Sequence, residues 1–264
     1  MGKAIKVFVL FAVAAGLIAA AGYPKRLNSK ALEKQMVPVG DGIWMSKYEC
    51  TNQWYNLFLS DLKAQGKLAQ YEQYKFDTAC WSATFPLAYV GPMEGVYHSH
   101  PAYNNFPAVG MSYEGAAAFC AWLTEWYKQQ PNKKKANWVF SLPTNQEWEM
   151  AALANGSGPY PWVGQYTRNH KGLYMANFKN DTTNYIADGA LFQAEVHSYY
   201  PNAKGLYNLS GNVAEMVKEK GQHKGGSWEN DASSIQIHAA DPYAGISKPH
   251  PCIGFRVVAK KLNN

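Results

Sequence analysis

Cysteine is scarce in this sequence of 264 residues, which contains only Cys50, Cys80, Cys120 and Cys252. No two of them have the C-x-x-C spacing that zinc and redox motifs use, so such a motif is not indicated. An even number of cysteines permits two disulfides in an oxidising compartment. The sequence does not choose among the three connectivities.

The sequence also lacks internal repeats, low-complexity linkers and an extended basic patch. Without repeats or linkers, a single domain is expected. The only dense basic run is Lys133–Lys135, which is more typical of a solvated loop than of a nucleic-acid surface. The formal net charge of +6 falls to +4 (6 − 2) when Lys3 and Lys6 are removed with a leader. We therefore predict no nucleic-acid partner.

The N-terminus has the pattern of a secretory signal peptide over residues 1–22. Lys3 and Lys6 precede an apolar run, Val7–Ala21, which ends in three alanines. The alternative is an uncleaved anchor, but the run is shorter than the ~20 residues that span a bilayer. No cysteine follows the run, so a bacterial lipoprotein anchor is not encoded. We predict cleavage near Ala21 or Gly22 and export without a membrane span.

After the leader, the sequence predicts a loose arm over residues 23–36 and a globular domain over residues 37–264. Strand character begins at Ile43–Met45. Three polar residues begin helices: Thr51, Ser112 and Thr144, the last with Glu147 in a capping box. From residue 155 onward, short strands, glycines and turns dominate.

Residues 77–106 are aperiodic and rich in Pro, Gly and aromatic residues, which predicts a long ordered loop. Such loops are often functional, and Tyr and Trp dominate interface energetics. The aromatic residues predicted to bind a partner are Trp81, Phe85, Tyr89, Tyr97 and Tyr103. The alternative is that these rings cover the core of the domain itself.

Seven sequence blocks, in order, resemble the sulfatase-modifying-factor family, whose founding member is the formylglycine-generating enzyme. The blocks are Lys47–Asn52, Phe106–Tyr113, Ala118–Leu123, Ser141–Glu149, Gly205–Glu215, Lys224–Trp228 and Gly254–Val257. The resemblance implies an irregular α+β fold with few regular elements, related to C-type-lectin-like folds. Within these blocks Trp122 and Trp148 are core candidates, and Arg256 is predicted to pair with a buried carboxylate such as Glu149.

The resemblance also locates chemistry that this chain lacks. The family's oxidase holds copper with two cysteines, three residues after the Ser of the Gly-Gly-Ser block and five residues further on. Asn230 and Ile235 occupy those positions here. Soft thiolates suit Cu(I), and neither residue supplies one. The family's non-haem-iron branch needs an N-terminal helical bundle with histidines, which this sequence does not show. We therefore predict a protein that is not an enzyme.

Structural calcium is a further implication of the resemblance. One predicted site comprises Asn208, Gly211, Val213 and Glu215. The other comprises the side chains of Asn177 and Asp188 with the carbonyls of Phe178 and Ala190. Oxygen ligands in short loops are what Ca²⁺ requires. The alternative for residues 208–212 is a simple turn.

The segment from Asp77 to Gly110 also resembles the GldK- and GldJ-like gliding-motility and type IX secretion proteins of Bacteroidota, although this chain is short and lacks their lipobox cysteine. The resemblance implies an accessory or assembly subunit in the periplasm, associated with the outer membrane through a ring-forming protein partner.

Two alternative functions remain. A periplasmic enzyme of another chemistry would have a pocket of His or carboxylates near Ser227–Asp231. A glycan- or peptide-binding module would have an aromatic groove near Trp81–Tyr103.

Overall fold

The computed structural model describes residues 28–40, 42–131, 133–134, 137–154, 156, 158–180 and 186–261. The predicted signal peptide lies outside the described residues. The helices are α1 (Ser29–Gln35), α2 (Asn52–Ala64), α3 (Leu68–Tyr74), α4 (Cys80–Thr84), α5 (Gly91–Val96), the 3₁₀ turn η1 (Pro101–Tyr103), α6 (Tyr113–Lys128) and α7 (Asn145–Leu153). The strands are β1 (Met36–Gly40), β2 (Ile43–Ser46), β3 (Trp138–Ser141), β4 (Ala214–Met216), β5 (His223–Lys224), β6 (Ile253–Gly254) and β7 (Val258–Lys261).

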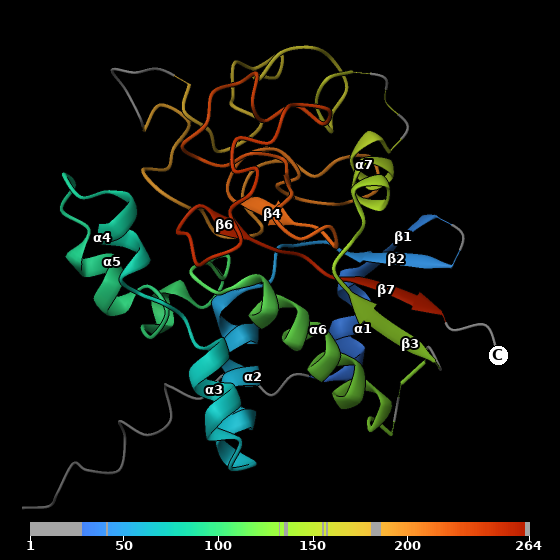
Figure 1. The fold of residues 1–264 in the computed structure, drawn as a ribbon. Coiled ribbons are helices and arrows are strands. Elements are labelled where there is room, and N and C mark those ends of the chain that lie inside the picture. The colour runs from blue at the N-terminus through green and yellow to red at the C-terminus, as the bar shows by residue number, and fades with distance from the viewer. Residues whose placement is uncertain are drawn as a thin grey trace, which may run out of the picture.

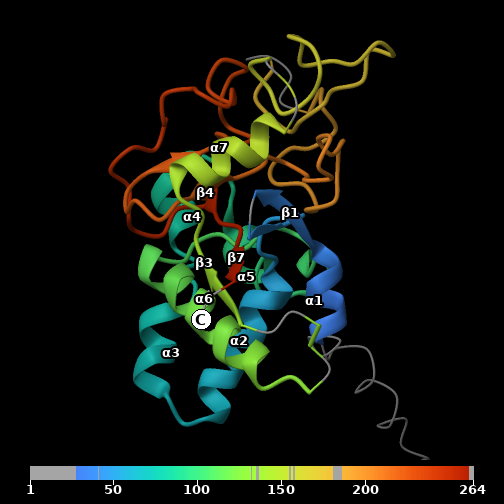
Figure 2. The same cartoon turned by 90° about the vertical axis from the view of Figure 1, so that its right-hand side faces the viewer.

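The larger of the two sheets is antiparallel and has the strand order β1-β2-β7-β3. Strand β7, near the C-terminal end of the described chain, lies between β2 and β3. Its pairing with β2 brings the N-terminal and C-terminal parts of the described chain together. Trp44 and Phe140 both pair with Ala259 across this strand. Helix α6 packs on β3, and α7 packs beside β1 (Figures 1 and 2).

A loop-rich layer covers the other side of this sheet (Figure 1). It holds a small second sheet, β5-β4-β6, in which β4 is antiparallel to β5 and parallel to β6. Helices α4 and α5 lie together at the opposite side of the molecule from β1 and β3. This sparse α+β arrangement agrees with the predicted fold class.

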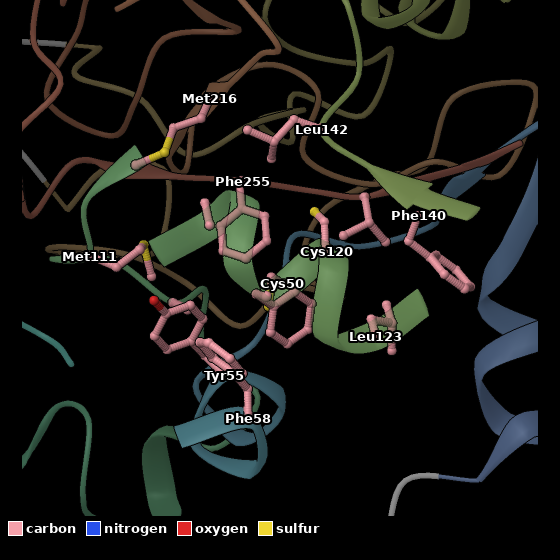
Figure 3. Close-up of a cluster of buried hydrophobic side chains, with 14 of the residues drawn as sticks. Cys50, Tyr55, Phe58, Met111, Cys120, Leu123, Phe140, Leu142, Met216 and Phe255 are labelled. Atoms are coloured by element: carbon pink, nitrogen blue, oxygen red, sulfur yellow. The ribbon is translucent and has the colours of Figure 1, made fainter. Parts of the chain in front are cut away.

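Aromatic rings from distant parts of the chain form the main core, which lies between α2, α6 and the C-terminal strands (Figure 3). Tyr55 of α2 stacks on Phe119 of α6 at 5.8 Å, and Phe255 meets Phe119 edge-on at 5.5 Å. The Tyr55 hydroxyl donates to the carbonyl of Tyr74 at 2.8 Å. Each ring excludes a large apolar area from water, and the hydroxyl of Tyr55, which is the one polar atom of these three side chains, is paired.

Local capping chemistry explains where the longer helices begin. The side chains of Thr51, Ser112 and Thr144 accept hydrogen bonds from the backbone N–H of Trp54, Gly115 and Glu147. The Glu147 carboxylate in turn accepts from the N–H of Thr144, which completes the capping box. The predicted helix starts and the strand at Ile43–Met45 are confirmed. Trp148 is buried as predicted, and Trp122 packs half-buried against the main core.

The predicted loose arm is wrong for its described part. Residues 29–35 form α1, which the Asn28 side chain caps by accepting from the N–H of Ala31 at 2.8 Å. Leu32 and Met36 are buried in the main core. One leucine among polar residues gives too weak a periodicity to predict a helix, and the tertiary contacts supply the stability.

The long loop predicted at residues 77–106 is also corrected, because α4, α5 and η1 occupy it. These elements are five, six and three residues long, too short for an apolar periodicity to show in the sequence. The four cysteines are free and buried, so neither of the two permitted disulfides forms. Among the described residues, no helix combines the length and apolarity needed to cross a membrane.

Candidate functional site

The Gly-Gly-Ser block forms a tight turn just before Asn230 and Ile235, the two positions where the resemblance expects the copper thiols. Gly225 and Gly226 have φ values of 86° and 62°. A Cβ on either glycine would stand 2.8 Å from a backbone oxygen, of Leu209 or of Ser234. Only glycine combines this backbone conformation with this close approach.

Neither residue that replaces a copper thiol is placed to bind a metal. The Asn230 side-chain oxygen accepts hydrogen bonds from the N–H of Ser227 at 2.8 Å and from its hydroxyl at 3.1 Å. Ile235 is fully buried in an apolar cluster with Tyr160, Ala176 and Phe178. Both residues therefore have structural contacts that hold the turn and the loop layer together.

A buried polar cluster lies beside this turn and was missed from the sequence. The hydroxyls of Ser227 and Tyr243 are 2.6 Å apart, and the Cys252 thiol donates to the Glu229 carboxylate at 3.0 Å. Burial raises the pKa of the Cys252 thiol well above its usual value, and Glu229 raises it further. A protonated thiol is a hydrogen-bond donor rather than a nucleophile or a metal ligand. Because the bonded partners lie 16 and 23 positions apart, no local motif reveals the cluster.

Two histidines border the cluster, and each has a structural partner. Asp241 accepts from the backbone N–H of His223 at 2.8 Å and lies 3.2 Å from its Nδ1. Burial lowers the pKa of His250 to about 4, helped by His223 and Lys248, and its Nδ1 accepts from the N–H of Cys252. Within the described ranges, no three His, Cys, Asp or Glu side chains are grouped to hold a metal ion.

Arg256 pairs with a buried carboxylate as predicted, but that carboxylate is Glu215 rather than the suggested Glu149. Arg256 Nε donates to Glu215 Oε2 at 2.6 Å, and its NH2 group donates to Glu215 Oε1. The other guanidinium hydrogens bond to the carbonyls of Ser46, Lys47 and Tyr207. Glu149 pairs instead with Lys224 at 2.7 Å.

A second buried carboxyl, Glu49, lies next to this pair. Asn208 and Asn212 donate their side-chain amides to its two oxygens at 3.1 and 2.8 Å. Burial raises the pKa of Glu49 to about 8, against the lowering effect of Arg256, and the Glu215 carboxylate raises it further. The sequence placed Glu49 in a family block but gave no sign of its pKa, which depends on contacts about 160 residues away.

The first predicted calcium set does not fit a cation. Both oxygens of Glu215 accept hydrogen bonds from Arg256, and Oε2 also accepts from Trp148 at 2.7 Å. The Asn208 amide is directed to Glu49 and to the carbonyl of Val196. Gly211 and Val213 are buried in the same turn. A carboxylate already neutralised by a buried guanidinium is a poor ligand for a second positive charge.

The second calcium set is partly brought together around Asp188. Its carboxylate accepts from the N–H of Phe178 at 2.8 Å and from the N–H of Ala190 at 3.2 Å. Burial raises the pKa of Asp188, and these two N–H groups lower it. The Asn177 side-chain amide instead donates to the carbonyl of Phe192 and to Asn212. In this second set, the Asp188 carboxylate forms no ion pair with any described residue.

The five aromatic residues predicted to bind a partner do not share one surface. Trp81 and Tyr97 are fully buried in a small core with Cys80, Val90 and Val109, so their assignment to an interface is wrong. The Tyr97 hydroxyl donates to the carbonyl of Pro107 at 2.7 Å. Phe85 and Tyr103 pack half-buried against this core. Aromatic composition alone could not separate rings that cover this small core from rings that face solvent.

Tyr89 keeps 90% of its surface exposed, and Leu87, which the sequence analysis missed, is fully exposed. Both residues lie in the short connection between α4 and α5. We call this connection, residues 85–90, the α4–α5 tip. It exposes one aromatic and one aliphatic side chain to solvent.

Comparisons with known proteins agree with this geometry. The family model of the sulfatase-modifying factor enzyme 1-like domain matches residues 12–261. A formylglycine-generating enzyme of Thermomonospora curvata is 32% identical over 145 residues, 53% of this chain and 42% of that protein. An inactive C-alpha-formylglycine-generating enzyme 2 of Mus musculus is 30% identical over 175 residues, 61% of this chain and 50% of that protein. The matches therefore span half or less of these relatives.

Two solved structures are similar in fold. The Treponema denticola variable protein 1 has a TM-score of 0.54 at 16% identity, covering 83% of this chain and 84% of that chain. CarF has a TM-score of 0.51 at 19% identity, covering 84% and 87%. The family match over nearly the whole chain, with the Gly-Gly-Ser turn and the arginine–glutamate pair in place, shows that this chain belongs to the family of sulfatase-modifying factor enzyme 1-like domains.

Proposed function

We propose that this protein is a non-catalytic, exported binding subunit that acts by protein–protein contact. The observation that carries the proposal is the replacement of both copper thiols by Asn230 and Ile235, whose side chains have structural contacts instead. Relatives that are named inactive C-alpha-formylglycine-generating enzyme 2, in Bos taurus and Mus musculus, support it, because non-catalytic members exist in this family.

The partner we propose is a ring or complex of a gliding-motility or type IX secretion machinery. The support is the resemblance of residues 77–110 to GldK- and GldJ-like proteins. In this proposal the protein lies in the periplasm, and the partner holds it at the outer membrane.

The partner contact is proposed at the tip between α4 and α5, on Leu87 and Tyr89. Exposed tyrosines are strong interface anchors because they bury a large area at a low entropic cost. Because both side chains are exposed, they contribute little to the free energy of unfolding. Substitutions here should therefore change partner binding without changing stability. Trp81 and Tyr97, which lie beneath the tip, hold it in place rather than meeting the partner.

Co-purification from the native host after mild solubilisation tests this proposal. The Leu87→Ser/Tyr89→Ala variant is expected to lose partner association at least about 10-fold, which corresponds to about 1.4 kcal/mol. Its unfolding free energy should stay within about 0.5 kcal/mol of wild type. Tyr166→Ala is the matched control, because Tyr166 is 80% exposed and belongs to the segment between α7 and β4 rather than to the α4–α5 connection. A monomeric wild-type protein without partners, or full binding by the double variant, contradicts the proposal.

We also propose that structural calcium binds at Asp188. The half-buried carboxylate and the neighbouring loop carbonyls are oxygen donors of the kind that Ca²⁺ prefers. The Glu215 set is left out of this proposal because Arg256 already neutralises it.

A further inference from the structure

A short segment of the loop-rich layer exposes several apolar side chains close together in the sequence. We call this segment, residues 162–174, the basic hairpin. Val163 keeps 95% of its surface exposed, Tyr166 80% and Leu173 50%. The ribbon of the segment, yellow in Figures 1 and 2, lies beyond α7, at the opposite end of the molecule from α2 and α3. Apolar side chains exposed together mark an interaction surface, and the proposed partner contact does not use this one.

The basic hairpin is held by its own backbone. The N–H of Asn169 donates to the carbonyl of Leu173, and the N–H of Met175 donates to the carbonyl of Thr167, each at 2.9 Å. The Asn169 side chain closes the turn by accepting from the N–H of Lys171 at 2.9 Å and from that of Leu173 at 3.1 Å. The hairpin therefore keeps its shape without burying its apolar side chains.

The charge of this segment has one sign. Residues 158–180 contain three basic residues and no Asp or Glu. Arg168 and Lys171 are exposed, and neither takes part in a salt bridge of the described residues. The Arg168 guanidinium lies 3.9 Å from the centre of the Tyr174 ring and donates to the carbonyl of Gly172 at 3.3 Å. These partners are neutral, so the positive charge of the hairpin stays uncompensated.

Basic and apolar side chains on one protruding loop limit the class of partner. A nucleic acid pairs with the two cations but gains nothing from the aliphatic side chains of Val163 and Leu173. An anionic membrane surface satisfies both, because Lys and Arg meet lipid phosphates while apolar side chains enter the boundary between headgroups and acyl chains. Tyr is also enriched at that boundary. A loop with a side chain as exposed as Val163 enters a lipid layer more readily than it fits a folded protein surface.

We propose that the basic hairpin binds an anionic membrane surface. Arg168 and Lys171 meet the lipid phosphates, and Val163, Tyr166 and Leu173 lie in the apolar boundary beneath them. The protein lies on the membrane and does not span it through this contact. The hairpin and the α4–α5 tip share no residue, so either assignment can fail alone. Tyr166→Ala remains a control for partner binding, because solubilisation removes the lipid surface in that experiment.

Sedimentation with lipid vesicles tests the proposal. Vesicles of phosphatidylcholine mixed with phosphatidylglycerol are compared with vesicles of phosphatidylcholine alone. All proteins are purified in the same form, so any lipid binding by residues 1–22 is common to them. The wild type is expected to bind the anionic vesicles about 10-fold or more tightly than the neutral ones, and added salt should weaken this preference.

One pair of variants tests the charge. Arg168→Gln/Lys171→Gln should weaken binding to the anionic vesicles about 10-fold or more, because each basic residue near such a surface contributes roughly 5-fold. Arg168→Lys keeps the charge and should bind within about 2-fold of wild type. Lys63→Gln/Lys67→Gln is the matched control, because it removes the same charge from exposed lysines at the end of α2 and should bind normally.

A second pair of variants tests the apolar contact. Val163→Ser/Leu173→Ser should also weaken binding about 10-fold or more. Leu68→Ser/Leu87→Ser, which removes two exposed leucines outside the hairpin, should bind as wild type does. The melting curves of all variants should stay unchanged, because the substituted side chains are exposed.

Three results overturn the inference. The first is equal binding of the wild type to both kinds of vesicle. The second is hairpin variants that bind the anionic vesicles as tightly as the wild type or as the matched controls. The third is a loss on Arg168→Gln/Lys171→Gln without a loss on Val163→Ser/Leu173→Ser, together with equal binding of a soluble polyglutamate peptide, because the hairpin is then a site for an acidic protein.

Discussion

Replacing Arg256 with methionine tests the buried pair that joins the two sheets. Arg256 and its partner Glu215 are 0% and 1% exposed. The guanidinium bonds to Glu215 and to the carbonyls of Ser46, Lys47 and Tyr207. It therefore links the end of β2, the loop layer and β4. Arg256→Met removes these donors and leaves a buried carboxylate without a compensating charge.

Breaking a buried pair from one side costs about 3–5 kcal/mol, a large part of the total stability of about 5–15 kcal/mol. With a urea dependence of about 2–3 kcal/mol per molar, the midpoint should fall by ~1–2.5 M. Lys224→Met is the matched control. Its pair with Glu149 has side chains that are 11% and 32% exposed, so it should cost about 1 kcal/mol or less.

The double variant Arg256→Met/Glu215→Leu should recover part of the loss, because the uncompensated charge is gone, while the carbonyls still lack their bonds from Arg256 and the Trp148 indole N–H loses Glu215. Urea unfolding followed by tryptophan fluorescence measures all four proteins. A cost below about 1 kcal/mol for Arg256→Met, or a double variant no more stable than the single one, refutes this reasoning.

Three further predictions concern titration, thiols and metal. Between its ordinary pKa of about 4.5 and its folded value of about 8, Glu49 keeps its proton only in the folded state. The unfolding free energy should thus fall as pH rises through this window, by up to about 1.4 kcal/mol per unit, and then level off. A stability difference between wild type and Glu49→Gln that does not vary over this window contradicts the burial of an ionisable Glu49. Ellman's reagent should label none of the four cysteines in the folded protein and all four in denaturant without reductant; fewer than four in denaturant would indicate a disulfide. EDTA should lower the melting temperature of wild type and of the control Glu72→Gln by several degrees but leave Asp188→Asn unaffected, because a ligand of the folded state stabilises it; an unchanged wild-type curve argues against exchangeable calcium at Asp188.

Local chemistry explains which features the sequence could predict. At the starts of α2, α6 and α7, a capping side chain bonds to the backbone N–H three residues further on; the capping residues are Thr51, Ser112 and Thr144. Such signals are contained in four residues. The family blocks likewise predicted the Gly-Gly-Ser turn and the positions of Asn230 and Ile235.

The features that the sequence could not predict depend on distant partners. The choice of Glu215 over Glu149 by Arg256 depends on how β4 and the C-terminal segment meet, 41 residues apart. No local sequence feature of Trp81 and Tyr97 distinguishes a core ring from an interface ring. Only their packing in the folded structure shows that both rings belong to a core. The Asn56 amide of α2 bonds to the carbonyl of His98, 42 positions later, and no single motif contains both residues.

The central claim, that this member of the family does not generate formylglycine, is tested most directly by its reaction with a sulfatase peptide. The purified protein, loaded with Cu(I), is incubated in air with a peptide that contains the substrate cysteine, and the peptide mass is measured. The formylglycine-generating enzyme of Thermomonospora curvata serves as the positive control. With Asn230 and Ile235 in place of the thiols, the peptide should keep its cysteine. Formation of the aldehyde above the level of a no-protein blank would contradict the account.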